Sequence, residues 1–440
     1  MSQLRPSNPR QLHSSSRLAA LLLSAASAAT LSLACGSGAV QPGGKLVQSN
    51  LARAAASSAP ADDVTRQSQD DSTFACDLYA QLATKPGNLF FSPYSISSAL
   101  AMTSAGAAGS TETVIASALD FSMPAPRVHA AFNALDQALA SRAQAGTSVH
   151  NGPFELNIAN ALWAQTGMTL EKPFLDTLAA DYGAGVHLEP FAASPEPARA
   201  DINAWVSDHT SGRIPELLRA GEITSDTRFV LTNAVDFNGS WAIPFVKANT
   251  QAATFHKLDG STESVQMMQQ TYEGFAVKGA GFTVAELPYS NPDLTLTLIV
   301  PDEGQFAAVE ALLSGTFLAA QLAAETPSEI TLGLPKFTAS TQASLKDSLT
   351  ALGMGEAFTA SADFSGIDGA HDIQIGDVIH QANVTIDENG TQAAAATAVI
   401  GVGSSAPGNQ VALAIDRPFI LALRDVPTGA VLFLGRIVAP

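Results

Sequence analysis

The pattern of hydrophobic and polar residues changes in character near Asn151. Before this point, apolar residues recur at spacings of three and four, which is typical of amphipathic helices. The helices predicted in this part span 77–82, 95–106, 110–119 and 128–142. Ser92 and Pro93 stand just before the second of them, where they suit the cap and the first turn of a helix.

After Asn151, short apolar or alternating runs predominate, and these are typical of strands. The predicted strands span 154–163, 229–237, 282–288, 294–300, 329–334, 379–386, 411–415, 419–424 and 430–438. Helical patterns at 173–180, 197–210, 306–313 and 344–352 lie between some of them. Helices that come first and strands that come mostly later, without strict alternation, predict one large α+β domain.

The first 35 residues have the arrangement of an export signal. Arg5, Arg10 and Arg17 precede an apolar run over 18–34 that is rich in Ala, Leu and Ser. Because this run is short for a membrane-spanning helix and is diluted by Ser and Thr, we expect it to be removed from the mature protein. Cys35 stands where a bacterial lipoprotein carries its lipidated cysteine. Two interpretations are therefore consistent with the sequence: a cell-envelope lipoprotein anchored through Cys35, and a secreted protein without a lipid anchor.

The next segment, 36–65, is rich in Gly, Ser, Ala, Pro and Gln and has no apolar period, which predicts a flexible linker. The folded domain is then expected over 66–440. Cys76 is the one cysteine that remains after the signal, so it cannot form an internal disulfide. Its apolar surroundings at helical spacing predict a buried free thiol.

The acidic balance of the chain excludes several classes of partner. The formal net charge is −18, and no basic run occurs after the first 20 residues. Nucleic acid and anionic membrane surfaces are not expected partners, because binding to phosphate requires clustered Lys and Arg. The sequence also lacks a Gly-x-Ser-x-Gly elbow, a His-Glu-x-x-His site and a Cys-x-x-Cys pair, so neither a hydrolase nor a metal site is expected.

A series of ordered blocks resembles the serpin family of serine protease inhibitors. One block reads Asn-Leu-Phe-Phe-Ser-Pro-Tyr-Ser-Ile from Asn88, and another reads Leu-Thr-Asn-Ala-Val-Asp-Phe-Asn-Gly-Ser-Trp from Leu231. Further blocks lie at 201–206, 210–214, 266–268, 286–289, 334–337, 352–354, 362–367 and 416–435. Together they cover residues 66–440 in the order of the family. The resemblance implies the serpin fold, with three β-sheets, eight or nine helices and an exposed reactive-centre loop at about 388–410.

The segment 384–408 resembles the hinge and the reactive loop of inhibitory serpins. The hinge positions are those of Glu388, Gly390, Thr391, Ala393, Ala394, Ala395 and Ala396. In the family, a protease cuts this loop and the part before the cut enters a sheet as a new central strand. Alternate residues of a strand share one face, so small side chains are needed where that face enters a packed interior. Four alanines also suit an ordinary helix, but their register with Glu388 and Thr391 favours a hinge.

This resemblance implies a suicide substrate that traps a protease as an acyl-enzyme, not an enzyme, and one that works as a monomer without a cofactor. Family spacing places the attacked bond at Ser404–Ser405, sixteen residues after Glu388, with Val402 and Ala406 as competitors in the segment 402–407. None of these residues is basic, so elastase-like or subtilisin-like proteases are the expected targets. A cysteine protease is a further candidate.

Two more groups of residues follow from the resemblance. The shutter, where the sheet parts, corresponds to Ser92, Ser95, Asn233 and His380. The breach, at the mouth of insertion, corresponds to Trp241, Lys336 and Glu388, with Lys336 expected to pair with Glu388. His380 has no second His or Cys nearby in sequence, so we expect a hydrogen-bonded core histidine rather than a metal ligand.

The competing interpretation is a non-inhibitory serpin with a binding, carrier or chaperone role. Such proteins usually have a charged, bulky or Pro-containing hinge, and 391–397 has none of these features. The segment 128–142, which is basic in heparin-binding relatives, has few Lys or Arg, so no heparin-type cofactor is expected.

Overall fold

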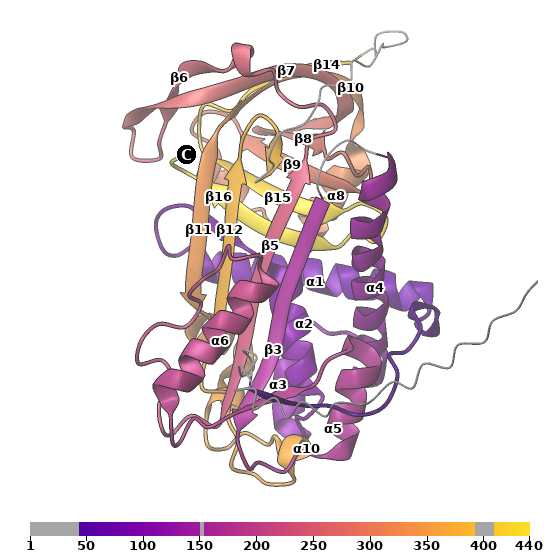
Figure 1. Ribbon diagram of the computed structural model, residues 1–440. Helices are drawn as coiled ribbons and strands as arrows, with labels where there is room; N and C mark the ends of the chain where they lie inside the picture. Colours follow the sequence, from indigo (N-terminus) through magenta and orange to yellow (C-terminus); the bar gives the residue numbers. More distant parts are fainter. Residues whose placement is uncertain (1–43, 150–153, 392–408) are drawn as a thin grey trace, which may run out of the picture. The chain divides into compact units, whose positions relative to one another are not determined.

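The computed structural model describes residues 44–149, 154–391 and 409–440 (Figure 1). Cys35, the hinge alanines Ala393 to Ala396 and the predicted reactive bond Ser404–Ser405 lie outside the described residues. The described part contains both helices and sheets that are not in strict alternation, which confirms the predicted α+β class.

A seven-stranded sheet, called here the central sheet, has the strand order β1-β4-β3-β5-β13-β12-β11. Its strands are β1 (Lys45–Val47), β4 (Val186–Glu189), β3 (Phe154–Gln165), β5 (Phe229–Ser240), β13 (Gly390–Thr391), β12 (Val378–Ile386) and β11 (Phe337–Ser344). All residues of β5 are buried. A strand that is buried on both faces is rich in apolar residues, and the pairs and triplets of such residues over 229–237 explain why the sequence pattern identified it, although buried polar residues such as Asn233 and Asp236 interrupt them.

The other nine strands form a second sheet of order β14-β10-β7-β8-β9-β15-β16-β2, with β6 also paired to β7. They are β14 (Gln410–Ala414), β10 (Thr326–Pro335), β7 (Thr262–Gly279), β8 (Phe282–Pro288), β9 (Leu294–Pro301), β15 (Phe419–Asp425), β16 (Val431–Ile437), β2 (Leu89–Phe91) and β6 (Gln251–His256). At Ala276, β7 pairs with both β10 and β8. This continuity joins the described strands into two hydrogen-bonded sheets, where the resemblance predicted three.

The described residues contain ten α-helices, slightly more than the eight or nine expected. They are α1 (Ala61–Leu82), α2 (Pro93–Ser104), α3 (Gly109–Ala118), α4 (Ala125–Val149), α5 (Lys172–Thr177), α6 (Pro195–His209), α7 (Phe306–Glu310), α8 (Gly315–Ala324), α9 (Lys346–Leu349) and α10 (Ser365–Asp368). Helix α8 was not predicted, because it is apolar or small at almost every position and so has no helical period.

Helices cover the central sheet on both faces. On the inner face, α2 contacts β5 and β16 and is buried almost all round. Its first turn is fixed as the sequence predicted: Ser92 Oγ accepts a 3.2 Å hydrogen bond from Ser95 N, and Pro93 follows the cap. On the outer face, α6 packs on β3 and lies in front of the lower part of the sheet (Figure 1).

The predicted linker over 36–65 is wrong from residue 44 onwards. Strand β1 pairs antiparallel with β4, and α1 begins at Ala61. Ala54 N donates to Ala180 O, and the side chains of Asn133 and Gln137 donate to Ala54 O. Main-chain and amide hydrogen bonds of this kind leave no hydrophobic period in the sequence, so a search for such a period missed the segment.

Cys76 is 3% exposed, and burial raises the pKa of its thiol to about 12, which confirms the predicted buried free thiol. Across residues 44–149, 154–391 and 409–440, no helix has the length and apolar character needed to cross a membrane.

Candidate functional site

The central sheet is closed at one end and parted at the other. Strands β5 and β12 pair directly as parallel neighbours from Leu231 and Val378 to Val235 and Ala382. Beyond that point β13 lies between them and pairs antiparallel with both. We call the directly paired part the seam. The start of the predicted hinge therefore already occupies a strand position at the open end of the sheet.

Gly390 is required by a close backbone approach. A Cβ atom at this position would lie 2.0 Å from Gly239 O and 2.7 Å from Ser240 Cα, both on β5. Thr391 follows and is 2% exposed, and its Oγ1 lies 2.7 Å from Tyr289 OH. A small hydroxyl side chain fits here, and a longer one would displace Tyr289 or the packed rings around it.

Glu388 ties the base of the loop to two neighbouring segments. Its Oε2 accepts a 2.8 Å hydrogen bond from Lys336 Nζ, and its Oε1 accepts a 2.9 Å bond from Thr250 Oγ1. The Glu388 side chain is 6% exposed and that of Lys336 is 37% exposed. Burial by itself would raise the pKa of Glu388, but the hydrogen bonds from Lys336, the backbone and Thr250 outweigh it and hold the pKa below its usual value.

Trp241 holds the turn that leads into β13. Its Nε1 donates to Asp387 O at 2.9 Å, and its backbone N donates to Asn389 O at 2.9 Å. The indole stacks on Tyr289 with ring centroids 4.7 Å apart. Of the three residues that the resemblance assigned to the breach, Glu388 lies within the short segment from Asp387 to Asn389, and Trp241 and Lys336 both bond to that segment.

At the seam, a polar network links three strands to the start of α2. Asn160 on β3, Asn233 on β5 and His380 on β12 lie in register with one another. Asn233 Nδ2 donates to Ser95 Oγ at 2.6 Å and to Asn160 Oδ1 at 2.7 Å. The four residues assigned to the shutter are therefore brought together, although they come from three distant parts of the chain.

The hydrogen bonds define the state of His380. Ser92 N donates to His380 Nε2 at 3.2 Å, so this ring nitrogen is an acceptor. Nδ1 then carries the proton and donates to Asn233 Oδ1 at 2.5 Å. Complete burial lowers the pKa of His380 to about 3, because the imidazolium would lose its hydration, and the ring is neutral at pH 7. The predicted hydrogen-bonded core histidine is what the structure contains.

Sequence reasoning missed three residues of these sites: Asn160, Thr250 and Tyr289. Asn160 left a signal, since it is a polar residue between Ala159 and Ala161 within a predicted strand. Tyr289 ended the family block at 286–289, but nothing in the sequence connected it or Thr250 with the loop, because their roles depend on segments that only the fold brings next to it. Over the part of the chain that the structure describes, no cluster of three or more His, Cys, Asp or Glu residues could hold a metal ion.

Comparison with known proteins assigns this chain to a known family. A family model described as serpin (serine protease inhibitor) matches residues 69–440. The leukocyte elastase inhibitor of Bos taurus is 35% identical over 379 residues, which cover 83% of this chain and 97% of the relative. The chain belongs to the serpin family.

Solved structures match the fold of this chain. The thermophilic serpin tengpin in its native state matches with a TM-score of 0.75 and 25% identity, over 84% of this chain and 93% of that one. Thyroxine-binding globulin in complex with thyroxine matches with a TM-score of 0.73 and 29% identity, over 85% and 99%. The relatives include one named as an elastase inhibitor and one named as a thyroxine-binding globulin, and as a member of the serpin family the chain is not an enzyme.

Proposed function

We propose that the protein inhibits serine endopeptidases as a suicide substrate, by inserting its cleaved reactive loop into the central sheet. The observation that carries the proposal is the position of β13. Gly390 and Thr391 lie between β5 and β12 at one end, while the same two strands are paired directly below. Further residues of the loop can extend β13 only by parting the seam.

The existing register predicts where each inserted residue would lie. Continuing the two antiparallel ladders beyond Thr391 sets Thr397 between Asn233 and His380. Insertion to this depth replaces the direct hydrogen bond between Asn233 and His380. Residues 393, 395 and 397 share the inner face with Thr391, and all three are Ala or Thr in this chain.

The same register supports Ser404–Ser405 as the reactive bond. Strand β5 begins at Phe229, and continuing the ladder brings Gly401 opposite it. A cavity of about 440 Å³ lies at this end of the seam and is lined by residues that include Phe229, Gly376 and Asp377. The insertable strand therefore ends three residues before Ser404, which leaves this acylated residue just outside the sheet. Val402 and Ala406 fit this spacing less well.

In the proposed mechanism, the serine of the protease attacks the carbonyl carbon of Ser404. The peptide bond to Ser405 breaks, the amine of Ser405 leaves with a proton, and an ester joins the protease to Ser404. The segment from Asn389 to Ser404, about sixteen residues at ~3.3 Å each, spans on the order of 50 Å, and its alignment along the sheet carries the protease to the far end. The free energy that drives this movement comes from completing the sheet. Before cleavage, the native form is kinetically trapped. Distortion of the displaced protease stalls hydrolysis of the ester.

Elastase-like and subtilisin-like proteases are the proposed targets, since the residues around the bond are small. The similarity to a leukocyte elastase inhibitor supports the first class. Cysteine proteases are a further class to test. The inhibitor is proposed to act as a monomer. No heparin-type cofactor is proposed, because residues 128–142, which are basic in heparin-binding relatives, include few Lys or Arg.

We also propose that the protein is exported through the signal over 1–35, and that it is either secreted or anchored by lipid at Cys35. Mass spectrometry of the mature N-terminus distinguishes these outcomes. A cleaved chain without modification indicates secretion, an acylated Cys35 indicates an anchored lipoprotein, and an intact Met1 contradicts export.

Incubation of the mature protein with an elastase and with a subtilisin tests the inhibitory function. We expect a complex that survives SDS, with the acylated residue identified by mass spectrometry as Ser404. Clean cleavage of the loop without a complex, in a protein that gains no thermal stability, would instead indicate a non-inhibitory serpin with a carrier or chaperone role.

A further inference from the structure

The segment that joins α6 to β5, residues 210–228, crosses the outer face of the central sheet. We call it the crossing segment. Its apolar side chains Ile214, Leu217, Leu218 and Ile223 are all less than 5% exposed. They pack in one cluster with residues of the sheet, namely Ala159, Ala161 and Trp163 of β3, Val230 and Ala234 of β5, and Ile379 of β12. Most of this apolar contact lies on the β3 and β5 side of the seam.

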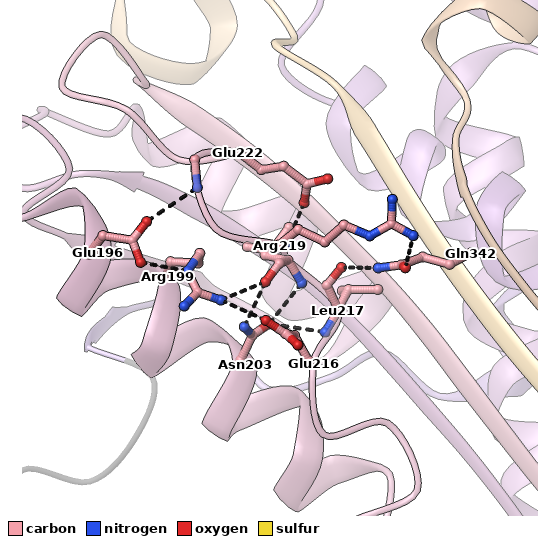
Figure 2. Close-up of polar contacts among 10 residues, drawn as sticks. Glu196, Arg199, Asn203, Glu216, Leu217, Arg219, Glu222 and Gln342 are labelled. Atoms are coloured by element: carbon pink, nitrogen blue, oxygen red, sulfur yellow. Dashed lines mark hydrogen bonds and ion pairs between the residues drawn. The ribbon is translucent and has the colours of Figure 1, made fainter.

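Ionic contacts also hold the crossing segment to β3 and β5. The Arg213 guanidinium pairs with Asp236 of β5, which is 1% exposed, and with Glu155 of β3 at 3.1 Å. Within the segment and α6, Asn203 Oδ1 accepts hydrogen bonds from Leu217 N at 3.0 Å and Leu218 N at 2.8 Å (Figure 2). The crossing segment and α6 therefore form one unit that is fixed to the β3–β5 half of the sheet.

On the other side of the seam, one residue of β11 carries a pair of hydrogen bonds to the same unit. Gln342 Nε2 donates to Leu217 O at 2.7 Å, and Arg219 Nη2 donates to Gln342 Oε1 at 2.5 Å (Figure 2). Gln342 pairs with Gln381 of β12, which pairs with Ala234 of β5. These bonds thus bridge the sheet at a level where the seam is closed.

Parting the seam breaks these bonds as a matter of geometry. A strand that enters between β5 and β12 moves them about 4.8 Å further apart, because this is the spacing of neighbouring strands. Hydrogen bonds of 2.5 and 2.7 Å do not survive such a displacement. Asn383 Nδ2 of β12 also donates to Arg213 O of the crossing segment, at 3.4 Å. Since the crossing segment has most of its apolar contacts and both ion pairs on the β3–β5 side, this long bond and the two shorter bonds to Gln342 are the ones that yield.

We propose that Gln342 is a latch: its two hydrogen bonds to the crossing segment hold the seam closed, and their loss limits the rate at which a strand inserts. The latch rests on the proposed function, since it regulates the same insertion. Nearby, Gln381 Oε1 is buried and has no hydrogen-bond partner among the described residues.

The rate of insertion can be measured without a protease. A synthetic peptide with the sequence of residues 392–404 serves as the inserting strand, and its uptake by the mature protein is followed by the gain in thermal stability over time. Q342A removes both bonds to the crossing segment, and Arg219→Ala removes one. T338A is the matched control, because Thr338 lies on the same face of β11 and bonds Thr385 across β11 and β12 instead.

A hydrogen bond that exists only while the seam is closed adds to the barrier to insertion. Removing one such bond by mutation is expected to raise the rate of peptide uptake about fivefold. Q342A should therefore be fastest, Arg219→Ala intermediate, and T338A within about twofold of the wild type. Glu155→Gln weakens the contact to β3, which persists during insertion, and should leave the rate unchanged. Comparison of urea unfolding midpoints for Q342A and T338A separates faster insertion from general instability.

Two results overturn the latch and leave the proposed function intact. One is uptake by Q342A at the rate of T338A. The other is acceleration by Glu155→Gln but not by Q342A, which means that the crossing segment moves with β11 and β12. If the wild type takes up no peptide and also gains no stability after cleavage of its loop, the proposed function fails, and the latch fails with it.

Discussion

His380 Nδ1 on β12 lies 2.5 Å from Asn233 Oδ1 on β5, directly across the seam of the central sheet. The bond is part of a network that also fixes the first turn of α2 through Ser92 and Ser95. One neutral imidazole therefore joins the two halves of the sheet at the depth that Thr397 is proposed to reach. This contact therefore links the stability of the folded protein, the closure of the seam and the insertion of the loop.

The first prediction concerns pH. Burial lowers the pKa of His380 from 6.5 to about 3, so between these values the unfolded chain binds a proton that the folded protein excludes. Within this window, His380 makes the free energy of unfolding rise with pH by up to about 1.4 kcal/mol per pH unit. The same stability is lost as the pH falls. His380→Asn should flatten the dependence of unfolding free energy on pH. A slope that is equal in the wild type and the variant would contradict the neutral buried state.

The second prediction concerns Lys336 and Glu388. The pKa of Glu388 is depressed in the folded protein, so the ion pair stabilises the folded protein fully at pH values above 4.5, the ordinary pKa of Glu. This stabilisation is lost as the pH falls below that value and through the depressed pKa. Lys336 is 37% exposed, so the contribution is about 1 kcal/mol or less. Lys336→Met should lower unfolding free energy by this amount at pH 7 and much less at pH 3. An equal loss at both pH values argues for packing rather than charge.

The third prediction concerns Thr391. Thr391→Arg places a charge against Tyr289 in a site that is 2% exposed, where it lacks a partner and costs several kcal/mol. The protease should still bind and cleave the loop, but insertion slows and the protein behaves as a substrate. The number of inhibitor molecules consumed per protease measures this partition. Gln392→Arg is the control, because strand alternation directs residue 392 to the opposite face, and full inhibition by Thr391→Arg would falsify loop insertion.

The fourth prediction locates the reactive bond. Ser404→Arg should improve inhibition of a trypsin-like protease by about tenfold or more, because the residue before the bond fills the specificity pocket. Val402→Arg is the matched change two residues earlier and should have little effect. The second-order rate constants for complex formation with trypsin decide between them. A larger gain for Val402→Arg moves the bond toward the start of the segment 402–407.

Much of this protein was predictable from local sequence. The apolar and alternating patterns of β5, β8 and β9 and the Ser-Pro start of α2 identify their elements, because strand burial and helix capping are properties of consecutive residues. The family blocks predicted the approach of Lys336 and Glu388, and of Asn233 and His380. The structure contains both contacts.

Other features depend on residues that only the fold brings together. β1 is ordered by main-chain bonds to β4, and Asn160 and Tyr289 meet the site across strands far apart in sequence. The two-sided anchoring of the crossing segment likewise needs β3, β5 and β11 side by side. The sequence alone determined which segments are buried and which loop is small enough to insert. Only tertiary structure revealed the further polar partners, Asn160 in the seam network and Gln342 at the crossing segment, because a hydrogen bond depends on position in space and leaves no periodic trace along the chain.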